Sequence, residues 1–384
     1  MINQPHFRGI ISKIEKPSIW HDHCISIAGG VNMKMRANIF KGANKIGLED
    51  RPIPKAGLGE AVVKVTLTTI CGTDVHIMKG EYPVRIGQII GHEPVGVIHE
   101  LGDGFNGYKL GERVAINAIT PCGQCEYCLS ADWAQCGGFL GGWKMGNTID
   151  GCQADYVKIP NAMANLTKIP DELSDEDVLL TTDIFSTGLS GAESGNIQVG
   201  DIVAVFGQGP IGLSAAAGAK LKGAALIITV DTVPSRIKMS KKMGADIALD
   251  YKKTDPLKEI MKITNGRGVD VAIEAIGLQE SFENCIKCTR VGGTISSLGV
   301  YPAHLGTIGV PLQDFGFGIA DKKIVSTLCP GGKERMRRLI SLVKNERVNL
   351  RQLITHRFSL DEIEEAYRIF SNQLDGVIKV AIKP

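Results

Sequence analysis

The sequence lacks a long apolar run, and it lacks an excess of charge of either sign. No apolar stretch reaches the roughly 18 residues that a membrane-spanning helix needs. Lys and Arg together number 43 and Asp and Glu 41, so the formal net charge is only +2. A near-neutral chain has no general attraction for nucleic acid or for an anionic membrane. We therefore expect neither as a partner.

We also expect no secretory signal, because residues 1–34 lack a basic start followed by a long apolar region. We interpret 1–34 as an N-terminal extension without assigned chemistry, and we expect a cytoplasmic protein. The chain has no long repeat and no low-complexity segment. Its 384 residues, 43% of them hydrophobic, suit two domains with a sizeable core.

Two regions of the chain differ in composition and in the pattern of their apolar residues. Residues 35–186 are rich in β-branched residues and turn signals, which predicts short strands of an antiparallel, barrel-like domain. Residues 187–328 alternate apolar strands with helical segments, which predicts an α/β fold with a doubly wound parallel sheet. Residues 329–384 become helical and end in a strand that we expect to return to the first domain. The expected strands are 60–70, 93–102, 112–119, 201–207, 225–231, 269–277, 292–299, 323–328 and 376–384, and the expected helices are 210–223, 234–245 and 278–291.

The second region carries a nucleotide-binding signature. A strand runs into Gly207-x-Gly209-x-x-Gly212, a helix follows, and the next strand ends at Asp231, 19 residues beyond the last glycine. Such a glycine pattern alone is also typical of an ordinary tight turn. Its place between strand and helix, with an acid near the expected spacing, favours a dinucleotide site. The glycines admit a pyrophosphate to the helix N-terminus, where Pro210 and Ile211 lie.

Four cysteines gather in a short loop as C-x2-C-x2-C-x7-C, namely Cys122, Cys125, Cys128 and Cys136. Four thiolates complete the tetrahedral shell of zinc and leave no position for water, which is typical of a structural site. An iron–sulfur cluster of the ferredoxin type needs its fourth cysteine three residues on, followed by proline. Disulfides are disfavoured without a secretory signal. Zinc is the favoured interpretation.

An earlier segment offers a second set of metal-binding side chains. A catalytic zinc keeps about three protein ligands and leaves one position open. Cys71 and His92 fit two of these places, and the spacing does not identify the third. The other chemistry-bearing side chains in the segment are Thr73, Asp74, His76 and Glu93.

From about residue 35 onward, the chain resembles the medium-chain, zinc-dependent alcohol dehydrogenase family. The resemblance is carried by "CGTDVH", "GHEPVG", the four-cysteine lobe, "GQGPIG" and the acid at 231. "GGWKMGNTIDG", "TTDIFSTGLSGAE" and "LCPGGKERMRRLI" are similar to the microbial secondary-alcohol, or isopropanol-type, branch. This resemblance implies a GroES-like β-barrel catalytic domain joined to a Rossmann domain.

The resemblance implies two zinc ions per chain, one of them catalytic. Cys71, His92 and Asp183 would hold the catalytic zinc, and Glu93 would be an outer or transient ligand. Asp74 matches the residue that orients the zinc histidine.

The resemblance also implies the other working residues of the site. Thr73 would take the alcohol proton, and His76 would be the outer member of the relay, through the cofactor ribose, to solvent. Trp143 and Cys329 would line the substrate pocket, and Thr187 would lie near the nicotinamide.

The acid at the end of the second nucleotide-binding strand predicts NAD as the cofactor. NADP-dependent members of the branch carry Gly-Ser-Arg where this chain has Asp231-Thr232-Val233. A carboxylate binds the ribose hydroxyls of NAD and repels a 2′-phosphate. We expect Arg236 to pack over the adenine. The alternative is that Asp231 merely caps the following helix.

We therefore expect a zinc-dependent oxidoreductase that interconverts a small secondary alcohol and its ketone or aldehyde. Zinc acts as a Lewis acid on the hydroxyl, and the nicotinamide accepts the hydride. Alternatives are a polyol, threonine or aldehyde-directed dehydrogenase, or a non-catalytic zinc- and nucleotide-binding protein of the same fold. The resemblance to the isopropanol-type branch implies a homotetramer, and symmetric assembly is common among soluble enzymes.

Overall fold

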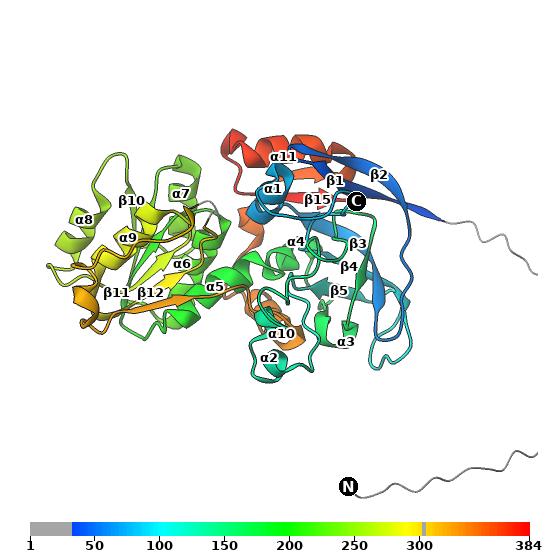
Figure 1. The fold of residues 1–384 in the computed structure, drawn as a ribbon, viewed down its shortest axis with the longest axis horizontal. Helices are drawn as coiled ribbons and strands as arrows, with labels where there is room; N and C mark the ends of the chain where they lie inside the picture. Colours follow the sequence, from blue (N-terminus) through cyan, green and yellow to red (C-terminus); the bar gives the residue numbers. More distant parts are fainter. Residues whose placement is uncertain (1–32, 302–304) are drawn as a thin grey trace, which may run out of the picture. The chain divides into compact units, whose positions relative to one another are not determined.

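The computed structural model describes residues 33–301 and 305–384, and residues 34–384 form one compact unit (Figure 1). The proposed extension, 1–34, lies outside the described residues except for its last two. Among the helices of these two ranges, none is both long enough and apolar enough to cross a membrane.

The first domain is built on a seven-stranded sheet in the order β14-β15-β3-β4-β5-β7, with β6 paired to β3. A separate hairpin, β1–β2, precedes it. Inward positions are apolar, as in β3, where only Lys64 is exposed. The strands are β1 (Lys34–Gly42), β2 (Lys45–Pro52), β3 (Ala61–Thr69), β4 (Val95–Leu101), β5 (Arg113–Ile116), β6 (Tyr156–Ile159), β7 (Leu166–Lys168), β14 (Ile354–Ser359) and β15 (Lys379–Lys383). The helices of this domain are short except at its ends: α1 (Gly72–Lys79), α2 (Glu126–Leu129), α3 (Ala162–Asn165), α4 (Asp175–Val178), α10 (Lys333–Lys344) and α11 (Ile363–Ser371).

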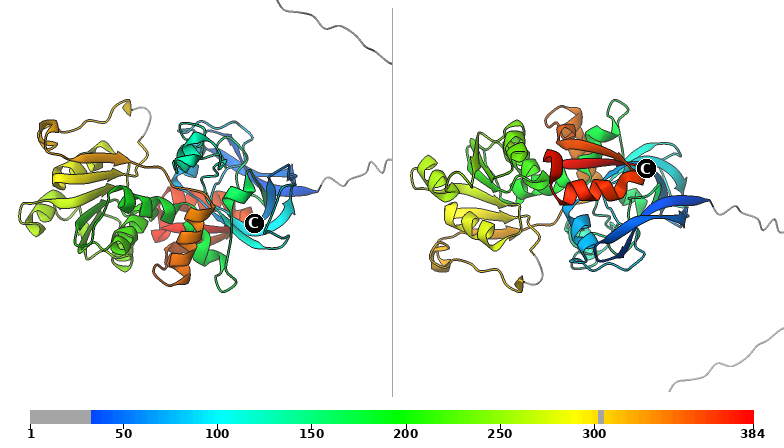
Figure 2. Two further views of the ribbon diagram at one scale, coloured as in Figure 1. Left: turned by 90° about the horizontal axis from the view of Figure 1, so that it is seen from below. Right: turned by 90° about the horizontal axis from the view of Figure 1, so that it is seen from above.

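The end of the chain joins the first sheet. β15 lies between β14 and β3, with Ala381 opposite Thr69 and Ile382 opposite Thr68. Helix α11 packs on β15 and beside the hairpin β1–β2, as the red and blue ribbons in Figure 2 show. Segments separated by more than 300 residues of sequence therefore meet in one layer.

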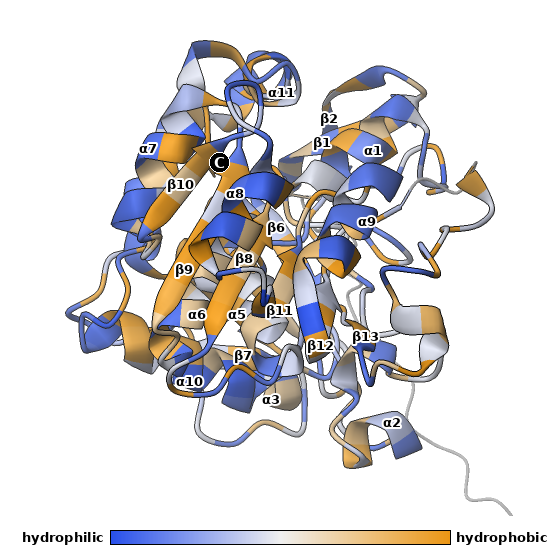
Figure 3. Ribbon diagram, turned by 90° about the vertical axis from the view of Figure 1, so that its left-hand side faces the viewer, coloured by the Kyte–Doolittle hydropathy of each residue, from blue (hydrophilic) through white to orange (hydrophobic). Residues whose placement is uncertain are grey.

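The second domain is a six-stranded parallel sheet in the order β10-β9-β8-β11-β12-β13, which confirms the doubly wound α/β prediction. Its central strands are buried on both faces and stand out as apolar arrows between the helices in Figure 3. The strands are β8 (Ile202–Phe206), β9 (Leu226–Asp231), β10 (Ile247–Asp250), β11 (Val269–Glu274), β12 (Thr289–Ser297) and β13 (Lys323–Ser326). The helices are α5 (Ile184–Ser194), α6 (Pro210–Lys222), α7 (Pro234–Lys242), α8 (Pro256–Ile263) and α9 (Gln279–Cys288).

The β8–α6 turn depends on glycine. Gly207 has a φ of +86°, and a Cβ on Gly212 would lie 1.7 Å from the carbonyl oxygen of Gly207. Pro210 occupies the first turn of α6, where its missing N–H costs no hydrogen bond. The sequence therefore folds here into a bare helix N-terminus at the carboxyl end of β8.

The basic run at 333–338 begins α10, and most of its side chains are exposed. Arg335, however, is largely buried and pairs with Glu193 at 2.8 Å while donating to Ser186 Oγ at 3.0 Å. Arg335 thereby joins α10 to α5. The proposed domain boundary at 186/187 falls inside α5.

Candidate active site and metal centres

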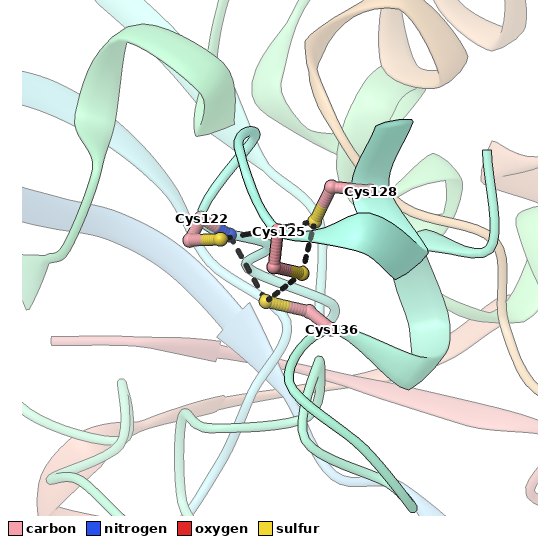
Figure 4. Close-up of side chains that lie close together, drawn as sticks. All are labelled: Cys122, Cys125, Cys128 and Cys136. Carbon is pink, nitrogen blue, oxygen red and sulfur yellow. Dashed lines mark hydrogen bonds between the residues drawn. The ribbon is translucent and has the colours of Figure 1, made fainter. Parts of the chain in front are cut away.

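The four cysteines of the loop converge on one point (Figure 4). Their Sγ atoms lie 3.5 Å apart for Cys125–Cys128 and 3.9 Å apart for Cys122–Cys128 and Cys125–Cys136. Tetrahedral coordination with Zn–S bonds of about 2.3 Å places sulfurs about 3.8 Å apart. A disulfide needs about 2.05 Å, and the enclosed space has room for a single ion rather than a cluster of several. The donor set fits zinc.

The surroundings of the thiols favour deprotonation at two of them. Backbone N–H groups outweigh the opposing effect of burial and lower the pKa of Cys122 and Cys125, the latter to about 6. Burial raises the pKa of Cys128 to about 12 and also raises that of Cys136. A metal ion binds thiolates, so its binding to this site releases protons from the two buried thiols.

The second metal-binding set comes from three places in the fold. Cys71 caps the N-terminus of α1, His92 and Glu93 precede β4, and Asp183 precedes α5. One ligand atom from each lies within 4.8 Å of the others. Asp183 Oδ2 is 3.5 Å from His92 Nε2 and 3.7 Å from Cys71 Sγ. These separations match neighbouring ligands of one tetrahedral zinc, about 3.3–3.7 Å apart.

The ionisation of His92 and that of Asp183 depend on each other. Burial alone would lower the pKa of His92, but the carboxylates of Asp74 and Asp183 outweigh it and raise that pKa well above its usual value. Burial opposes ionisation of Asp183, but His92 and the hydroxyl of Thr187 lower its pKa to about 2. A buried anion therefore faces the imidazole among these ligands, as a site for a divalent cation requires.

Glu93 is held by a buried lysine. Its Oε1 lies 2.7 Å from Lys379 Nζ, which also donates to the carbonyl oxygen of Ile70 at 2.7 Å. Burial raises the pKa of Glu93 to about 7, and Lys379 is the strongest opposing influence. The other carboxylate oxygen, Oε2, has no hydrogen-bond partner among the described residues. Glu93 thus has one engaged oxygen and one free oxygen beside the proposed metal ligands.

Asp74 lies next to His92, on the Nδ1 side of its ring. Its Oδ1 is 3.2 Å from His92 Nδ1, and its Oδ2 accepts the backbone N–H of Cys71 at 2.9 Å. Thr73 Oγ1 lies 3.7 Å from Cys71 Sγ. His76, one turn further along α1, is half exposed and pairs with Glu81 through Nδ1. Helix α1 thus leads from the ligand cluster to solvent.

The proposed pocket residues lie beside the ligand cluster. The ring of Trp143 is 5.9 Å from that of His92, and its Nε1 donates to the carbonyl oxygen of Met145. Cys329 Sγ lies 3.8 Å from the carbonyl oxygen of Asp183, and burial raises its pKa far above the usual value. Tyr82, which the sequence analysis missed, adds a ring 4.9 Å from Trp143. All three pack in one apolar cluster with Ile119.

The proposed cofactor residues lie at the carboxyl ends of β8 and β9. Gly209 caps α6, and Gln208 between the motif glycines donates its backbone N–H to Asp231 Oδ2 at 2.6 Å. Asp231 Oδ1 accepts the N–H groups of Thr232 and Val233 at 2.7 and 2.8 Å. Asp231 therefore both supports the turn into α7 and lies beside the glycine turn.

Two further predicted cofactor residues have local partners. Thr187 Oγ1 donates to Asp183 Oδ1 at 2.8 Å, which leaves Oδ2 facing the other ligands. Arg236 lies in the first turn of α7, is half-buried, and its Nε has no hydrogen-bond partner among the described residues.

Three residues near the site escaped the sequence analysis, namely Tyr82, Gln153 and Lys379. One of them left a signal: Lys379 is a single charge inside the apolar run "VIKVAI", and a buried lysine is almost always paired. The other two carry no motif.

Two family profiles match the chain. The "Alcohol dehydrogenase GroES-like domain" matches residues 57–171, and the "Zinc-binding dehydrogenase" profile matches residues 210–345. An alcohol dehydrogenase of Cupriavidus necator is 50% identical over 364 residues, covering 91% of this chain and 99% of the relative. An NADP-dependent isopropanol dehydrogenase of Thermoanaerobacter brockii is 36% identical over 88% of this chain and 96% of its own.

A solved structure shares the fold over most of its length. Zinc dependent alcohol dehydrogenase 2 from Streptococcus pneumonia has 34% identity and a TM-score of 0.84, covering 91% of this chain and 98% of that one.

Proposed function

Because the chain belongs to the medium-chain zinc alcohol dehydrogenase family, we propose that it interconverts small secondary alcohols and their ketones with NAD. Zinc-dependent alcohol dehydrogenase activity follows from the family. The choice of secondary alcohols and of NAD is our proposal. One observation carries it: the ligand cluster of Cys71, His92 and Asp183 adjoins an apolar cluster that contains Trp143 and Cys329.

We assign each group of the cluster a role. Cys71, His92 and Asp183 would hold the catalytic zinc, which supplies Lewis-acid charge to the substrate oxygen. Glu93 stands beside them as an outer or transient ligand, because Lys379 already binds one of its oxygens. Cys122, Cys125, Cys128 and Cys136 would hold a second zinc that stabilises the loop.

The proton of the alcohol leaves through α1 in this proposal. Thr73 Oγ1 is the hydroxyl nearest to the ligand cluster on that helix and receives the substrate proton. His76 Nδ1 is paired with Glu81, and its half-exposed ring exchanges protons with solvent. Oxidation then yields one carbonyl compound, one hydride on the nicotinamide and one proton in solution, so atoms and charges balance.

The apolar side chains beside the ligand cluster support a substrate with two small alkyl groups. Trp143, Tyr82 and Cys329 offer ring faces and a thiol but no charge, so a polyol or amino acid would leave polar groups unpaired. A ketone carbon carries two alkyl substituents, and both can lie against apolar side chains. This supports secondary alcohols over the polyol and threonine alternatives.

NAD is proposed from the position of Asp231. Its carboxylate lies beside the Gly207–Gly212 turn, where the adenosine ribose of a bound dinucleotide would lie. Three backbone N–H groups already hold it, so it is fixed in place. The relative from T. brockii bears an NADP-dependent name, which makes this residue the point at which the two proteins are expected to differ.

The test is a comparison of initial rates. Purified protein should contain two zinc ions per chain and oxidise 2-propanol and 2-butanol with a higher kcat/KM than ethanol or 1-propanol, and with NAD preferred over NADP. The control is Cys71→Ser, which should abolish turnover. Preference for a polyol or for a primary alcohol would disprove the substrate proposal while leaving the family activity intact.

We also propose that the protein is a homotetramer in the cytoplasm. The nine described cysteines are all free, which suits a reducing compartment. Self-association is supported by β13, an edge strand that pairs only with β12 among the described strands. Exposed apolar side chains gather on this strand and in the segment before it, namely Ile324 on β13 and Val300, Leu312, Phe317 and Ile319 before it. Such an edge invites a second copy of the chain.

Light scattering on a gel-filtration column tests the assembly. Ile324→Lys should reduce the oligomer to a smaller species. Leu58→Lys, a matched change at an exposed leucine of the first domain, should leave it intact. A wild-type monomer would contradict the proposal.

A further inference from the structure

Gln153 is a buried amide with four partners. It lies just before β6 and is fully buried. Its Oε1 accepts hydrogen bonds from Asn38 Nδ2 at 2.8 Å and from the Tyr367 hydroxyl at 3.0 Å. Its Nε2 donates to the carbonyl oxygen of Thr69 at 3.1 Å and to Asp74 Oδ2 at 3.4 Å. The amide cannot turn over, because that would set its carbonyl oxygen against two acceptors, the carbonyl oxygen of Thr69 and Asp74 Oδ2.

The fixed amide limits the freedom of Asp74. One carboxylate oxygen of Asp74 receives the N–H of Cys71 and the amide of Gln153. The other oxygen thereby lies 3.2 Å from His92 Nδ1, while Nε2 of the same ring lies 3.5 Å from Asp183 Oδ2. The orientation of the imidazole thus depends on a carboxylate that Gln153 helps to hold.

A second contact joins Gln153 to the histidine through the backbone. Gly91, the residue before His92, has a φ of +93°, and a Cβ there would lie 2.6 Å from Gln153 Cγ. The backbone N–H of Gln153 also donates to the carbonyl oxygen of Ile90 at 3.0 Å. The side chain of Gln153 therefore packs directly against the peptide that carries His92.

We infer that Gln153 is a positioning residue for the catalytic metal site: it acts through Asp74 and Gly91 to fix the ring of His92. Through Asn38 and Tyr367 it also ties β1 and α11 to that site. The inference rests on the proposed zinc site at Cys71, His92 and Asp183. Outer-shell groups of this kind typically change metal affinity or activity by about 10–100-fold when removed.

The experiment measures how fast each zinc leaves the protein. Wild type and Gln153→Met are mixed with a chelator and a chromogenic zinc indicator, so that two release phases are resolved. Met keeps the length of the side chain and its contact with Gly91 but removes the amide. The phase assigned to the catalytic site should accelerate about 10-fold or more in Gln153→Met. The phase from the four-cysteine site should not change.

A matched control separates positioning from general loss of stability. Gln88 is equally buried, but its side chain forms hydrogen bonds with Asp150 and Arg85 instead of Asp74. Gln88→Met should lower the melting temperature comparably and leave both release phases unchanged. With cobalt in the catalytic site, only Gln153→Met should shift the visible absorption bands, because the ligand geometry changes only there.

A third variant covers the case in which Gln153→Met does not fold. Tyr367→Phe removes one donor to the amide and should accelerate the same phase by a few-fold. Unchanged release and an unchanged cobalt spectrum in the variant that folds would overturn the inference. A wild-type protein that binds no metal at Cys71 and His92 would instead overturn the proposed function itself, and the inference with it.

Discussion

Lys379 and Glu93 form a 2.7 Å ion pair that is sealed from solvent, with exposed fractions of 0% and 1%. Removing one partner leaves an uncompensated buried charge, which typically costs about 3–5 kcal/mol. Lys379→Met should therefore lower the free energy of unfolding by about that amount, as measured by urea denaturation. Glu93→Gln in the same chain should recover part of the loss.

Lys168→Met provides the comparison, because Lys168 pairs with Glu112 at the same 2.7 Å but is half exposed. It should cost at most about 1 kcal/mol. Equal losses for the two lysine variants would show that burial of the first pair has no energetic consequence.

The two zinc ions should be separable by mutation. Cys125→Ser should remove one zinc and lower the melting temperature, while protein that survives stays active. Cys71→Ser should abolish turnover with a much smaller loss of stability. Cys285→Ser, at a buried thiol outside both sets, should keep both metals. The zinc content and the melting temperature of each variant test this prediction. Retention of both zinc ions by Cys125→Ser would refute the structural role of the four-cysteine site.

The aromatic pair of the pocket should set the substrate range. Trp143→Ala should admit bulkier ketones and shift relative kcat/KM by about 10–200-fold, equivalent to 1–3 kcal/mol. Tyr82→Ala should act in the same direction with a smaller effect, since the ring of Tyr82 packs against that of Trp143. Trp133→Phe, in the four-cysteine lobe, should leave the substrate ranking unchanged. An unchanged ranking in soluble Trp143→Ala would remove that residue from the pocket.

Replacement of Asp231 should relax the choice of cofactor. Asp231→Gly should bring kcat/KM with NADP close to that with NAD, and a basic residue at Thr232 or Val233 should extend the change. The same substitution should lower the melting temperature, because three N–H groups lose their acceptor. Asp246→Asn alters a carboxylate that binds Ile227 N at the other end of β9, and should leave the preference intact. Wild-type protein that uses both cofactors equally would contradict the role of Asp231.

Asp270 should make the stability of the second domain depend on pH. Burial opposes its ionisation, but Arg267, the N–H of Ile202 and Arg290 lower its pKa to about 2. The pKa is lowered below the unfolded value of about 3.9, so the stabilisation is present above pH 4 and lost as pH falls towards 2. It amounts to about 2 kcal/mol.

Asp270→Asn should thus be less stable than wild type at pH 6, and the difference should shrink below pH 4. Asp321→Asn, at an exposed carboxylate, should show no such dependence. Urea midpoints from pH 6 to pH 3 provide the measurement, and a constant difference across that range would exclude the ionised pair as its cause.

Local spacing made part of this molecule predictable. The four cysteines and the Gly207–Gly212 turn lie within short segments, so their chemistry can be interpreted without the fold. The strands β8, β9 and β11 were equally plain, since burial on both faces leaves an uninterrupted apolar run. Strand β2, strand β10 and helix α8 were missed, because they are half exposed and mix polar with apolar residues.

The side chains that support the site, Gln153 and Lys379, could not be predicted from the sequence for a different reason. Gln153 reaches Asp74 across 79 residues, and Lys379 reaches Glu93 across 286. Neither spacing recurs as a pattern, and each contact exists only because separate strands are brought together in one sheet. A resemblance supplied Asp183, which spacing alone had left open.

The insertion of β15 between β14 and β3 has a consequence for synthesis of the protein. Cys71, His92 and Asp183 have all been translated before Lys379, which follows Asp183 by 196 residues. At 5–20 residues per second, that interval lasts roughly 10–40 s. Throughout it, the growing chain carries a thiol and carboxylates that lack their counter-charge, and the first sheet lacks one of its inner strands. The ribosome-bound intermediate is therefore the form most exposed to premature metal capture and to aggregation. Synthesis of β14 and β15 ends that exposure.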